Sequence, residues 1–365
     1  MRAGPDASTL SAGPAPSFSE LRSGDEGWSV RVTSAARLSF TLIDLNGEMG
    51  RKNGMASLAV AAPSFRVLAT PSKKMSVVTD DNASDYKEIF EDYLQRLRRG
   101  IKGDPAKIVV EAGLPRHSGF GSKTTALLSI GKAYAALNER NMTTEEIAIY
   151  AGRAGTSGGS VNLTDRGGFI CDGGHRVTND FSDDPKKYLV PSRFARAGRK
   201  PPVLVSTAFP NWPILMIMPA GEHIHGQPEA DFFRKELPIP LVEARKTAHA
   251  VFMGLAPAVV EGDYEAFCIA FNRITFDTYF KQKQIGIQNP KVHKVLNESR
   301  KNGIDAIGMS SMGPGCFSFT RNPSKAVGWL KEMKQEGTVS DYWFTRATNT
   351  AASVERVPDW AFASK

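Results

Sequence analysis

The chain has 365 residues, 41% of them hydrophobic and 23% charged, a composition typical of globular proteins and without the long apolar run of a membrane span. The first residues lack the apolar stretch of a secretory signal, and the three cysteines form no CxxC pair, so we expect a cytoplasmic protein without a disulfide framework or zinc site. The net charge of +8 favours an anionic partner. Because the basic residues form no stripe with interleaved aromatics, we expect a small anion, with no nucleic acid and no membrane as partner.

Hydrophobic periodicity predicts a mixture of strands and helices. The helix over 84–99 rests on apolar residues at helical spacing, and Thr143 with Glu146 forms a capping box before another helix. In chain order, the pattern predicts strand 29–45, strand 55–70 broken at Pro63, helix 84–99, strand 107–112, helix 124–138, helix 144–152, strands 201–206 and 214–219, helices 239–261, 263–284 and 289–302, a strand at the start of 306–315, helix 326–335 and strand 340–348.

This order of elements predicts an α+β fold in two parts. We expect a domain over residues 28–205 and a second over 206–350. Residues 1–27, rich in proline, glycine, serine and alanine, are expected to form a mobile N-terminal tail, and residues 351–365 a C-terminal tail.

The strongest local motif is LPRHSGFGSKTT at 114–125, which joins a predicted strand to a predicted helix. Glycines allow backbone N–H groups to approach an anion, and the start of a helix adds unpaired N–H groups with a partial positive charge. Lys123 adds a charge, while the hydroxyls of Ser122 and Thr124 add donors. The motif matches neither a Walker loop nor a Rossmann fingerprint. It favours a phosphate site over the alternative of a tight turn beside a solvated lysine.

A second glycine cluster, over 152–175, surrounds the strand-like sequence GGFICD. Asp172 and His175, separated by two glycines, suit a carboxylate that binds Mg²⁺ or handles a proton. A β-hairpin with glycine turns is the more common outcome of such a pattern. A third cluster, GMSSMGPG at 308–315, offers donors that could close over the ligand of the first loop, although a buried turn is the more common outcome of such a pattern.

Together, these blocks resemble the β-ribofuranosylaminobenzene 5′-phosphate synthase family, within the galactokinase–homoserine kinase–mevalonate kinase (GHMP) superfamily. The resemblance covers roughly residues 30–348 and rests on ARLSFTLIDL at 36–45 and on the three glycine-rich blocks 114–125, 152–175 and 308–315. It implies a two-domain GHMP-kinase-like fold, with an N-terminal domain like that of ribosomal protein S5 and a C-terminal α+β sandwich. It also implies a homodimer.

The resemblance further implies a decarboxylating C-ribosyl transfer. Phosphoribosyl pyrophosphate would react with an aromatic carboxylic acid, releasing pyrophosphate and CO₂, with Mg²⁺ as cofactor. Serine stands at position 39, where the family usually has histidine, and lysine at position 123, where it usually has a small residue. These departures make the chain most similar to the C-nucleoside synthases of formycin and pyrazofurin biosynthesis, which use an aminopyrazole dicarboxylate. The alternatives are 4-aminobenzoate as acceptor, an ATP-dependent small-molecule kinase, and a non-catalytic anion-binding protein.

Carried over to this sequence, the resemblance gives three sets of site residues. Those expected to bind phosphate or pyrophosphate are His117, Gly119, Gly121, Ser122, Lys123, Thr124, Thr156, Ser157, Gly158, Ser310 and Ser311. Those expected to face the acceptor are Arg37, Ser39 and Asp44. Asp172, His175 and Lys123 are the catalytic candidates, and Asp172 is the candidate metal ligand.

Overall fold

Two antiparallel-rich sheets organise the chain. The computed structural model describes residues 27–115, 118–177, 189–191, 195, 198–224 and 226–358. Within these residues the larger sheet has eight strands and runs in the order β12-β1-β2-β4-β3, with β5 and β6 paired to β2 and β7 paired to β5. Its strands are β1 (Trp28–Asp44), β2 (Arg51–Pro71), β3 (Ser76–Val78), β4 (Ala106–Ala112), β5 (Phe169–Asp172), β6 (His175–Arg176), β7 (Val203–Thr207) and β12 (Ser353–Pro358).

The long strand β2 changes partners along its length. Its first half pairs with β5 through Met55–Leu58, and its second half pairs with β4 through Arg66–Pro71. The predicted break at Pro63 falls between these two segments, where the pairing of β1 with β2 also shifts register after Ala35. The strand β2 therefore pairs with β5 at one end of the sheet and with β4 at the other.

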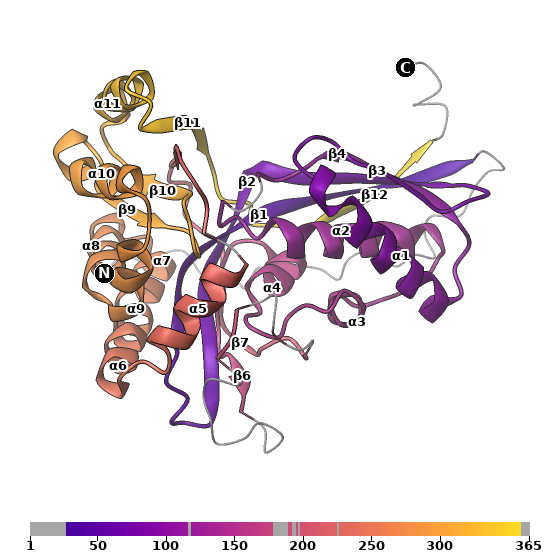
Figure 1. The fold of residues 1–365 in the computed structure, drawn as a ribbon, viewed down its shortest axis with the longest axis horizontal. Helices are drawn as coiled ribbons and strands as arrows, with labels where there is room; N and C mark the ends of the chain where they lie inside the picture. The colour runs from indigo at the N-terminus through magenta and orange to yellow at the C-terminus, as the bar shows by residue number, and fades with distance from the viewer. Residues whose placement is uncertain are drawn as a thin grey trace, which may run out of the picture.

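Helices cover one face of this sheet, as Figure 1 shows. The most buried of them is α2, whose Ala- and Leu-rich sequence presents apolar side chains on almost every side. The helices of this part are α1 (Lys87–Ile101), preceded by a 3₁₀ turn at Ser84–Tyr86, α2 (Ser122–Leu137), α3 (Thr144–Tyr150) and α4 (Gly159–Arg166). The predicted capping box between Thr143 and Glu146 is present at the start of α3.

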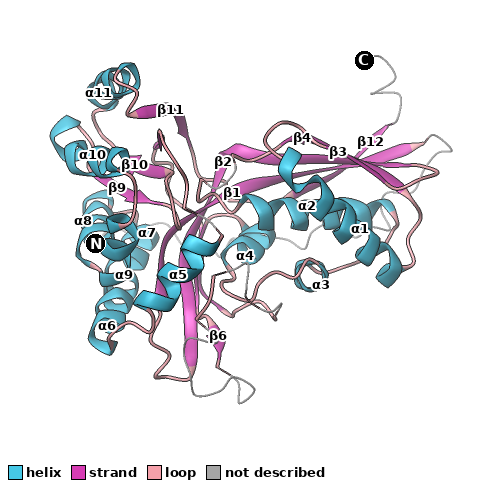
Figure 2. Cartoon of the chain, viewed as in Figure 1, coloured by secondary structure: helices cyan, strands magenta, loops and turns pink. Residues whose placement is uncertain are grey.

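The smaller sheet has four antiparallel strands within the described residues, in the order β11-β8-β10-β9. They are β8 (Ile214–Pro219), β9 (Ala306–Met309), β10 (Cys316–Phe319) and β11 (Val339–Thr345). The accompanying helices are α5 (Gln227–Glu236), α6 (Leu241–Ala250), α7 (Ala256–Glu261), α8 (Tyr264–Asp277), α9 (Tyr279–Gly286), α10 (Pro290–Ser299) and α11 (Pro323–Gln335), with a π-helical turn at Val251–Leu255 and a 3₁₀ turn at Arg300–Asn302. Figure 2 shows α6 and α8–α11 around the small sheet, at the opposite end of the molecule from α1, and, in this view, α5 nearer the middle, beside α4.

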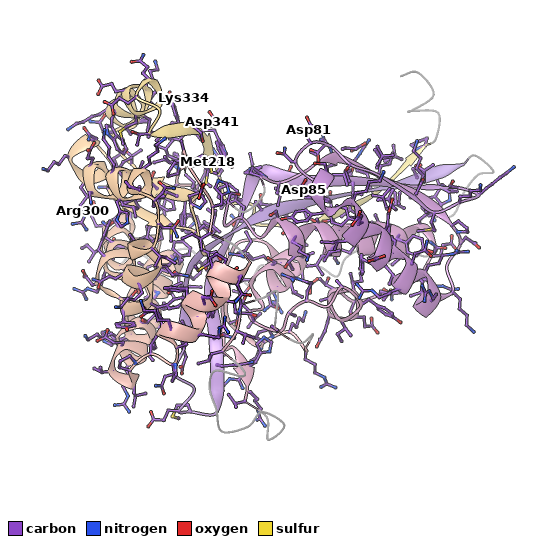
Figure 3. The ribbon with its side chains drawn as sticks, viewed as in Figure 1. Asp81, Asp85, Met218, Arg300, Lys334 and Asp341 are labelled. Atoms are coloured by element: carbon purple, nitrogen blue, oxygen red, sulfur yellow. The ribbon has the colours of Figure 1, made fainter. Side chains whose placement is uncertain are left out.

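One cluster of buried apolar side chains extends through both parts of the fold. At its centre the ring of Phe40, on β1, lies 4.9 Å from that of Phe271 and 5.1 Å from that of Phe317. Charged pairs lie at the periphery, as between Lys334 and Asp341, 2.9 Å apart and labelled in Figure 3. No helix in the described part of the chain is both long and apolar enough to cross a bilayer.

The structure differs from the sequence-based expectations at several elements, among them the short strand β3, which was not expected. Ser353–Pro358, expected to lie in a C-terminal tail, pairs antiparallel with β1 over six residues. Two helices were not expected: α4, inside the second glycine cluster, and α5. The helix expected over 263–284 is divided at Thr278, whose extended backbone separates α8 from α9.

Candidate functional site

The loop after β4 ends at an uncapped helix start. Gly121 occupies the N-cap of α2 in the left-handed conformation, with φ of 72°, and no side chain caps the helix. The first turn carries no acidic residue. Because the first N–H groups of a helix have no partner within it, this end of α2 presents donors and a partial positive charge to whatever lies before it.

The turn between β9 and β10 holds this loop in place. Ser310 Oγ donates a hydrogen bond of 2.8 Å to the carbonyl of Gly119 and accepts one of 3.0 Å from the backbone N–H of Ser39. Gly119 has φ of +85°, and a Cβ there would lie 2.0 Å from the carbonyl oxygen of Ser310. The third glycine cluster therefore contacts the first, as the sequence suggested. The hydroxyl of Ser310, however, donates its hydrogen bond to the loop and not to a ligand.

Two arginines converge beside the helix start. Arg37, on β1, donates from Nη1 to the carbonyl of Gly119, while its buried Nε has no hydrogen-bond partner among the described residues. Arg153 donates from Nε to the Oγ1 of Thr124 at 2.8 Å. Burial, together with the nearby charge of Arg153, lowers the pKa of Arg37 to about 10. Burial also lowers the pKa of Arg153. An anion placed between the two arginines would relieve both effects.

These groups line a cavity of about 350 Å³, here called the anion cavity. Its wall combines the glycine loop, the start of α2 and the two arginines with residues from α5 and from the β9–β10 turn. The residues are Arg37, Tyr86, Ile89, Gly119, Gly121, Ser122, Lys123, Thr124, Arg153, Ile224, Gly226, Glu229, Ser311, Met312 and Gly313.

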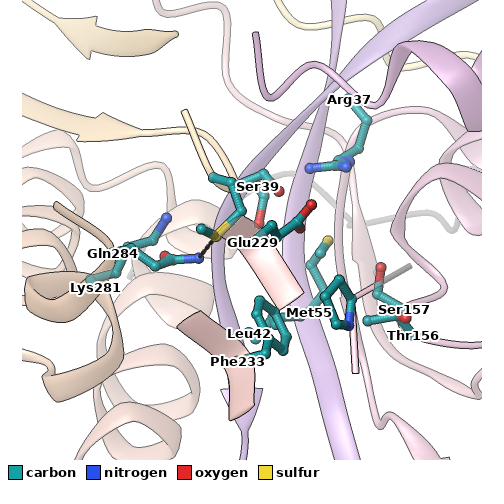
Figure 4. A pocket seen from close by; sticks show the side chains of 13 residues that line it. Arg37, Ser39, Leu42, Met55, Thr156, Ser157, Glu229, Phe233, Lys281 and Gln284 are labelled. Carbon is teal, nitrogen blue, oxygen red and sulfur yellow. Dashed lines mark hydrogen bonds between the residues drawn. The ribbon is translucent and has the colours of Figure 1, made fainter. Parts of the chain in front are cut away.

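A smaller cavity of about 70 Å³, here called the side chamber, adjoins it. The two share Arg37, Glu229, Ser311 and Met312. The side chamber is further lined by Ser39, Leu42, Met55, Thr156, Ser157, Pro191, Phe233, Lys281 and Gln284. Figure 4 shows Lys281 and Gln284 entering from α9, and Arg37 approaching from the other side of the chamber. The wall of the side chamber combines the apolar side chains of Leu42, Met55 and Phe233 with polar groups at opposite ends.

Most of the residues expected at the site line one of the two cavities. Gly119, Gly121, Ser122, Lys123 and Thr124 line the anion cavity. Thr156, Ser157, Ser311, Arg37 and Ser39 line the side chamber. His117 lies outside the described residues. Ser310 and Gly158 are buried and in neither wall.

Asp44, Asp172 and His175 are not in the wall of either cavity. Asp44 accepts hydrogen bonds from the backbone N–H groups of Asn46 and Gly47, so its carboxylate closes its own turn. Asp172 is fully buried, and one of its oxygens accepts the N–H of Gly174. Burial raises the pKa of Asp172 to about 7.

His175 is held neutral by its surroundings. Burial and the charges of Lys52 and Arg51 lower its pKa to about 4. The expected catalytic and metal-binding roles of Asp172 and His175 thus have no contact with a cavity to support them. The alternative of a β-hairpin is not formed by these strands either, because within the described residues β5 and β6 do not pair with each other and instead both pair antiparallel with β2.

Among the wall residues that sequence reasoning missed are three charged side chains, Arg153, Glu229 and Lys281, and the amide of Gln284. Arg153 lies inside the second glycine cluster, whose glycines gave no reason to single it out, and Glu229 lies on α5, a helix that was not expected. Lys281 belongs to YFKQKQIG, in which lysines read as surface residues. Only the position of α9 in the fold turns Lys281 inward. No cluster of three or more His, Cys, Asp or Glu side chains suited to a metal occurs among the described residues.

Comparison with family models supports the two-part organisation. Residues 86–165 match the GHMP kinases N terminal domain, and residues 255–338 match the GHMP kinases C terminal domain. Among solved structures, homoserine kinase from Cytophaga hutchinsonii superposes with a TM-score of 0.64 at 16% identity, covering 92% of this chain and 99% of that one. L. major mevalonate kinase superposes with a TM-score of 0.62 at 14% identity, covering 90% and 97%. The predicted GHMP-kinase-like α+β fold is confirmed.

Curated relatives are more similar in sequence. The chain is 31% identical over 299 residues to beta-ribofuranosylphenol 5′-phosphate synthase of Methanocaldococcus jannaschii, spanning 79% of this chain and 88% of the relative. It is 32% identical over 332 residues to the protein of that name from Archaeoglobus fulgidus, spanning 89% and 99%. The resemblance drawn from the sequence blocks is thereby confirmed at the level of the family.

Proposed function

The chain belongs to the β-ribofuranosylphenol 5′-phosphate synthase family, and from this we propose that it joins phosphoribosyl pyrophosphate to an aromatic carboxylic acid, with loss of pyrophosphate and CO₂. The observation that carries the proposal is the position of Arg37, which lines both the anion cavity and the side chamber. An activated ribose in the first cavity would present its C1 to a ring in the second.

The anion cavity fits a diphosphate leaving group. Arg37, Arg153 and Lys123 supply positive charge, and the start of α2 supplies N–H donors. As the bond from C1 to the pyrophosphate oxygen breaks, negative charge grows on the leaving group and is stabilised by donors already in place. The arrangement therefore lowers the energy of the transition state more than that of the bound substrate.

The side chamber would hold the ring, with the attacked carbon directed at C1. A bond forms between that carbon and C1, and the bond to the carboxylate carbon then breaks, its electron pair returning to the ring as CO₂ departs. The carboxylate leaves in place of a proton, so no general base is required for this step. Holding both partners in line while excluding water is the main task of the protein.

For the acceptor, we propose an aminopyrazole dicarboxylate, as in the C-nucleoside synthases of formycin and pyrazofurin biosynthesis. Ser39 lines the side chamber at the position where the family usually has histidine, so the chamber wall differs where the ring would lie. The net charge of +8 agrees with a dianionic acceptor. The competing acceptor is 4-aminobenzoate.

Mg²⁺ would accompany the pyrophosphate. It usually binds through one or two carboxylates together with substrate phosphates. Glu229 lines both cavities and is the acidic residue in their walls, so it fits this pattern better than the buried Asp172. Bound there, Mg²⁺ would supply neutralising charge to the leaving group.

The test is mass spectrometry of products formed from phosphoribosyl pyrophosphate, Mg²⁺ and a panel of amino-aryl and aminopyrazole carboxylates. We expect a C-nucleoside 5′-phosphate and, from carboxyl-labelled acceptor, labelled CO₂. Ligand-induced melting separates this activity from that of a kinase, because phosphoribosyl pyrophosphate should raise the unfolding temperature and ATP should not. Stabilisation by ATP alone, without any C-nucleoside product, would contradict the proposal.

A further inference from the structure

Lys281 is a buried lysine in the wall of the side chamber. Its side chain is on α9, the residue is 1% exposed, and Nζ donates a hydrogen bond of 2.7 Å to the carbonyl of Met309. That is the single hydrogen bond of this ammonium group among the described residues, and no carboxylate there lies within ion-pair distance of it. Since an ammonium has three donors, two remain for a ligand.

Such a group is costly to keep. Burial disfavours the charged form and lowers the pKa of Lys281 to about 7, and the charge of Arg37 acts in the same direction. A neutral side chain of similar length would fill the same space without this cost. The hydrogen bond to Met309 gives Lys281 a structural role, but that bond needs a donor and does not need a charge.

The other polar groups of the chamber complete a pattern. Gln284, one turn further along α9, donates to the sulfur of Met312, while its buried Oε1 has no hydrogen-bond partner in the described part of the chain. The chamber thus offers a cation and, beside it, an unused acceptor for an N–H group, with Leu42 and Phe233 as apolar walls. A ring that carries both a carboxylate and an N–H or amino group matches this wall.

The chemistry decides which carboxylate would bind there. A carboxylate that departs as CO₂ must lose its negative charge, so a cation held on it would stabilise the ground state more than the transition state. A carboxylate that stays on the ring keeps its charge throughout. We propose, resting on the function proposed above, that Lys281 binds the carboxylate retained in the product and so selects dicarboxylate acceptors, with Gln284 Oε1 accepting an adjacent N–H.

The experiment measures dissociation constants by calorimetry for two probes, 4-aminopyrazole-3,5-dicarboxylate and its monoamide. Wild-type protein should prefer the dicarboxylate by roughly tenfold or more, as expected for a charge-assisted hydrogen bond. Lys281→Met should abolish the preference by weakening dicarboxylate binding. Lys281→Gln, which keeps a donor for the Met309 carbonyl, should behave in the same way, because the charge is what is lost.

Lys283→Met is the matched control, since Lys283 lies on the same helix with its side chain 46% exposed, and it should retain the wild-type preference. Affinity for phosphoribosyl pyrophosphate should not change in any of these variants. A wild-type protein without the preference, or a Lys281→Gln variant that keeps it, would overturn the assignment of Lys281. A Lys281-dependent preference in a protein that forms no C-nucleoside phosphate would instead overturn the proposed function and leave the assignment of Lys281 standing.

Discussion

Besides Lys123, three basic side chains reach the two cavities from separate parts of the chain. Arg37 comes from β1, Arg153 from the segment before α4, and Lys281 from α9. The pKa of each is lowered, with burial as the largest cause. Binding of an anion would therefore stabilise the charged form of each side chain. The cavities hold an excess of positive charge, which anionic substrates would neutralise.

Lys123 tests the anion cavity directly. Because it stands in the first turn of α2 and lines that cavity, Lys123→Ala should weaken phosphoribosyl pyrophosphate binding by roughly tenfold. Lys107→Ala, an exposed lysine on β4, is the control for loss of one positive charge. Calorimetric titration gives both dissociation constants, and an unaltered value for Lys123→Ala would remove this residue from the site.

Asp172 makes stability depend on pH. Its pKa is raised to about 7 in the folded protein, against about 3.9 in an unfolded chain, so the folded state holds the proton more tightly. The resulting stabilisation is complete below about pH 4 and is lost as the pH rises through 7. Asp172→Asn should remove it, so the free energy of unfolding of the wild type, relative to the variant, should fall between about pH 4 and 7.

Urea denaturation of both proteins at several pH values measures this difference, with a slope of at most about 1.4 kcal/mol per pH unit. Comparison with the variant cancels the opposite contribution of His175, whose lowered pKa reduces stability at acid pH. A difference that stays constant with pH would mean that Asp172 is ionised in the folded protein.

At the scale of elements, hydrophobic periodicity predicted most of the strands and helices. It failed where an element is short or where its residues resemble those of a loop. The α4 sequence GSVNLTDR opens with glycine and serine and reads as part of a glycine-rich loop. The break at Thr278 interrupts a continuous helical pattern with a β-branched residue. The role of 353–358 depends on an exposed edge of β1, which no local pattern reveals.

The residues of the candidate site also fall into two groups, those that a local pattern predicts and those that the tertiary fold brings in. The loop 114–125 could be predicted because its own glycines and lysine determine its backbone geometry and its charge. Lys281 and Gln284 could not, because their inward direction results from how α9 packs, and Arg153 is one basic residue among many. A site made by neighbouring residues can therefore be predicted from the sequence. A site made by side chains that are distant in the sequence depends on the tertiary fold.

Gly119 connects two elements by close approach. Its substitution by alanine would drive a Cβ against the Ser310 carbonyl, and it also has a positive φ. Gly119→Ala should therefore displace the loop, lower the unfolding temperature and abolish measurable phosphoribosyl pyrophosphate binding. Gly152→Ala is the control, because Gly152 also has positive φ but no heavy atom within 4 Å of its Cβ position, so only a backbone cost of about 1–2 kcal/mol is expected. Equal losses in both variants would show that the contact with Ser310 is unimportant.

At the scale of the whole molecule, the two sheets share one core. Phe40, on a strand of the large sheet, contacts Phe271 and Phe317 from the other part of the fold. Phe40→Ala should lower the free energy of unfolding by roughly 3–5 kcal/mol while keeping a single transition in fluorescence and circular dichroism. Phe344→Ala, whose ring is on a residue 42% exposed, should have a much smaller effect. Two separate transitions in the wild type would contradict a common core.

The hydroxyl of Ser310 has a consequence for kinetics. It joins the Gly119 carbonyl, beside the anion cavity, to the backbone of Ser39 in the side chamber through two hydrogen bonds. A diphosphate that orders the loop would thereby change the position of the groups that bind the incoming ring. Thermodynamic reciprocity then requires each ligand to change the affinity of the other by one common factor. Initial-rate measurements should then show that each substrate lowers the apparent dissociation constant of the other by the same factor, and Ser310→Ala should bring that factor close to one.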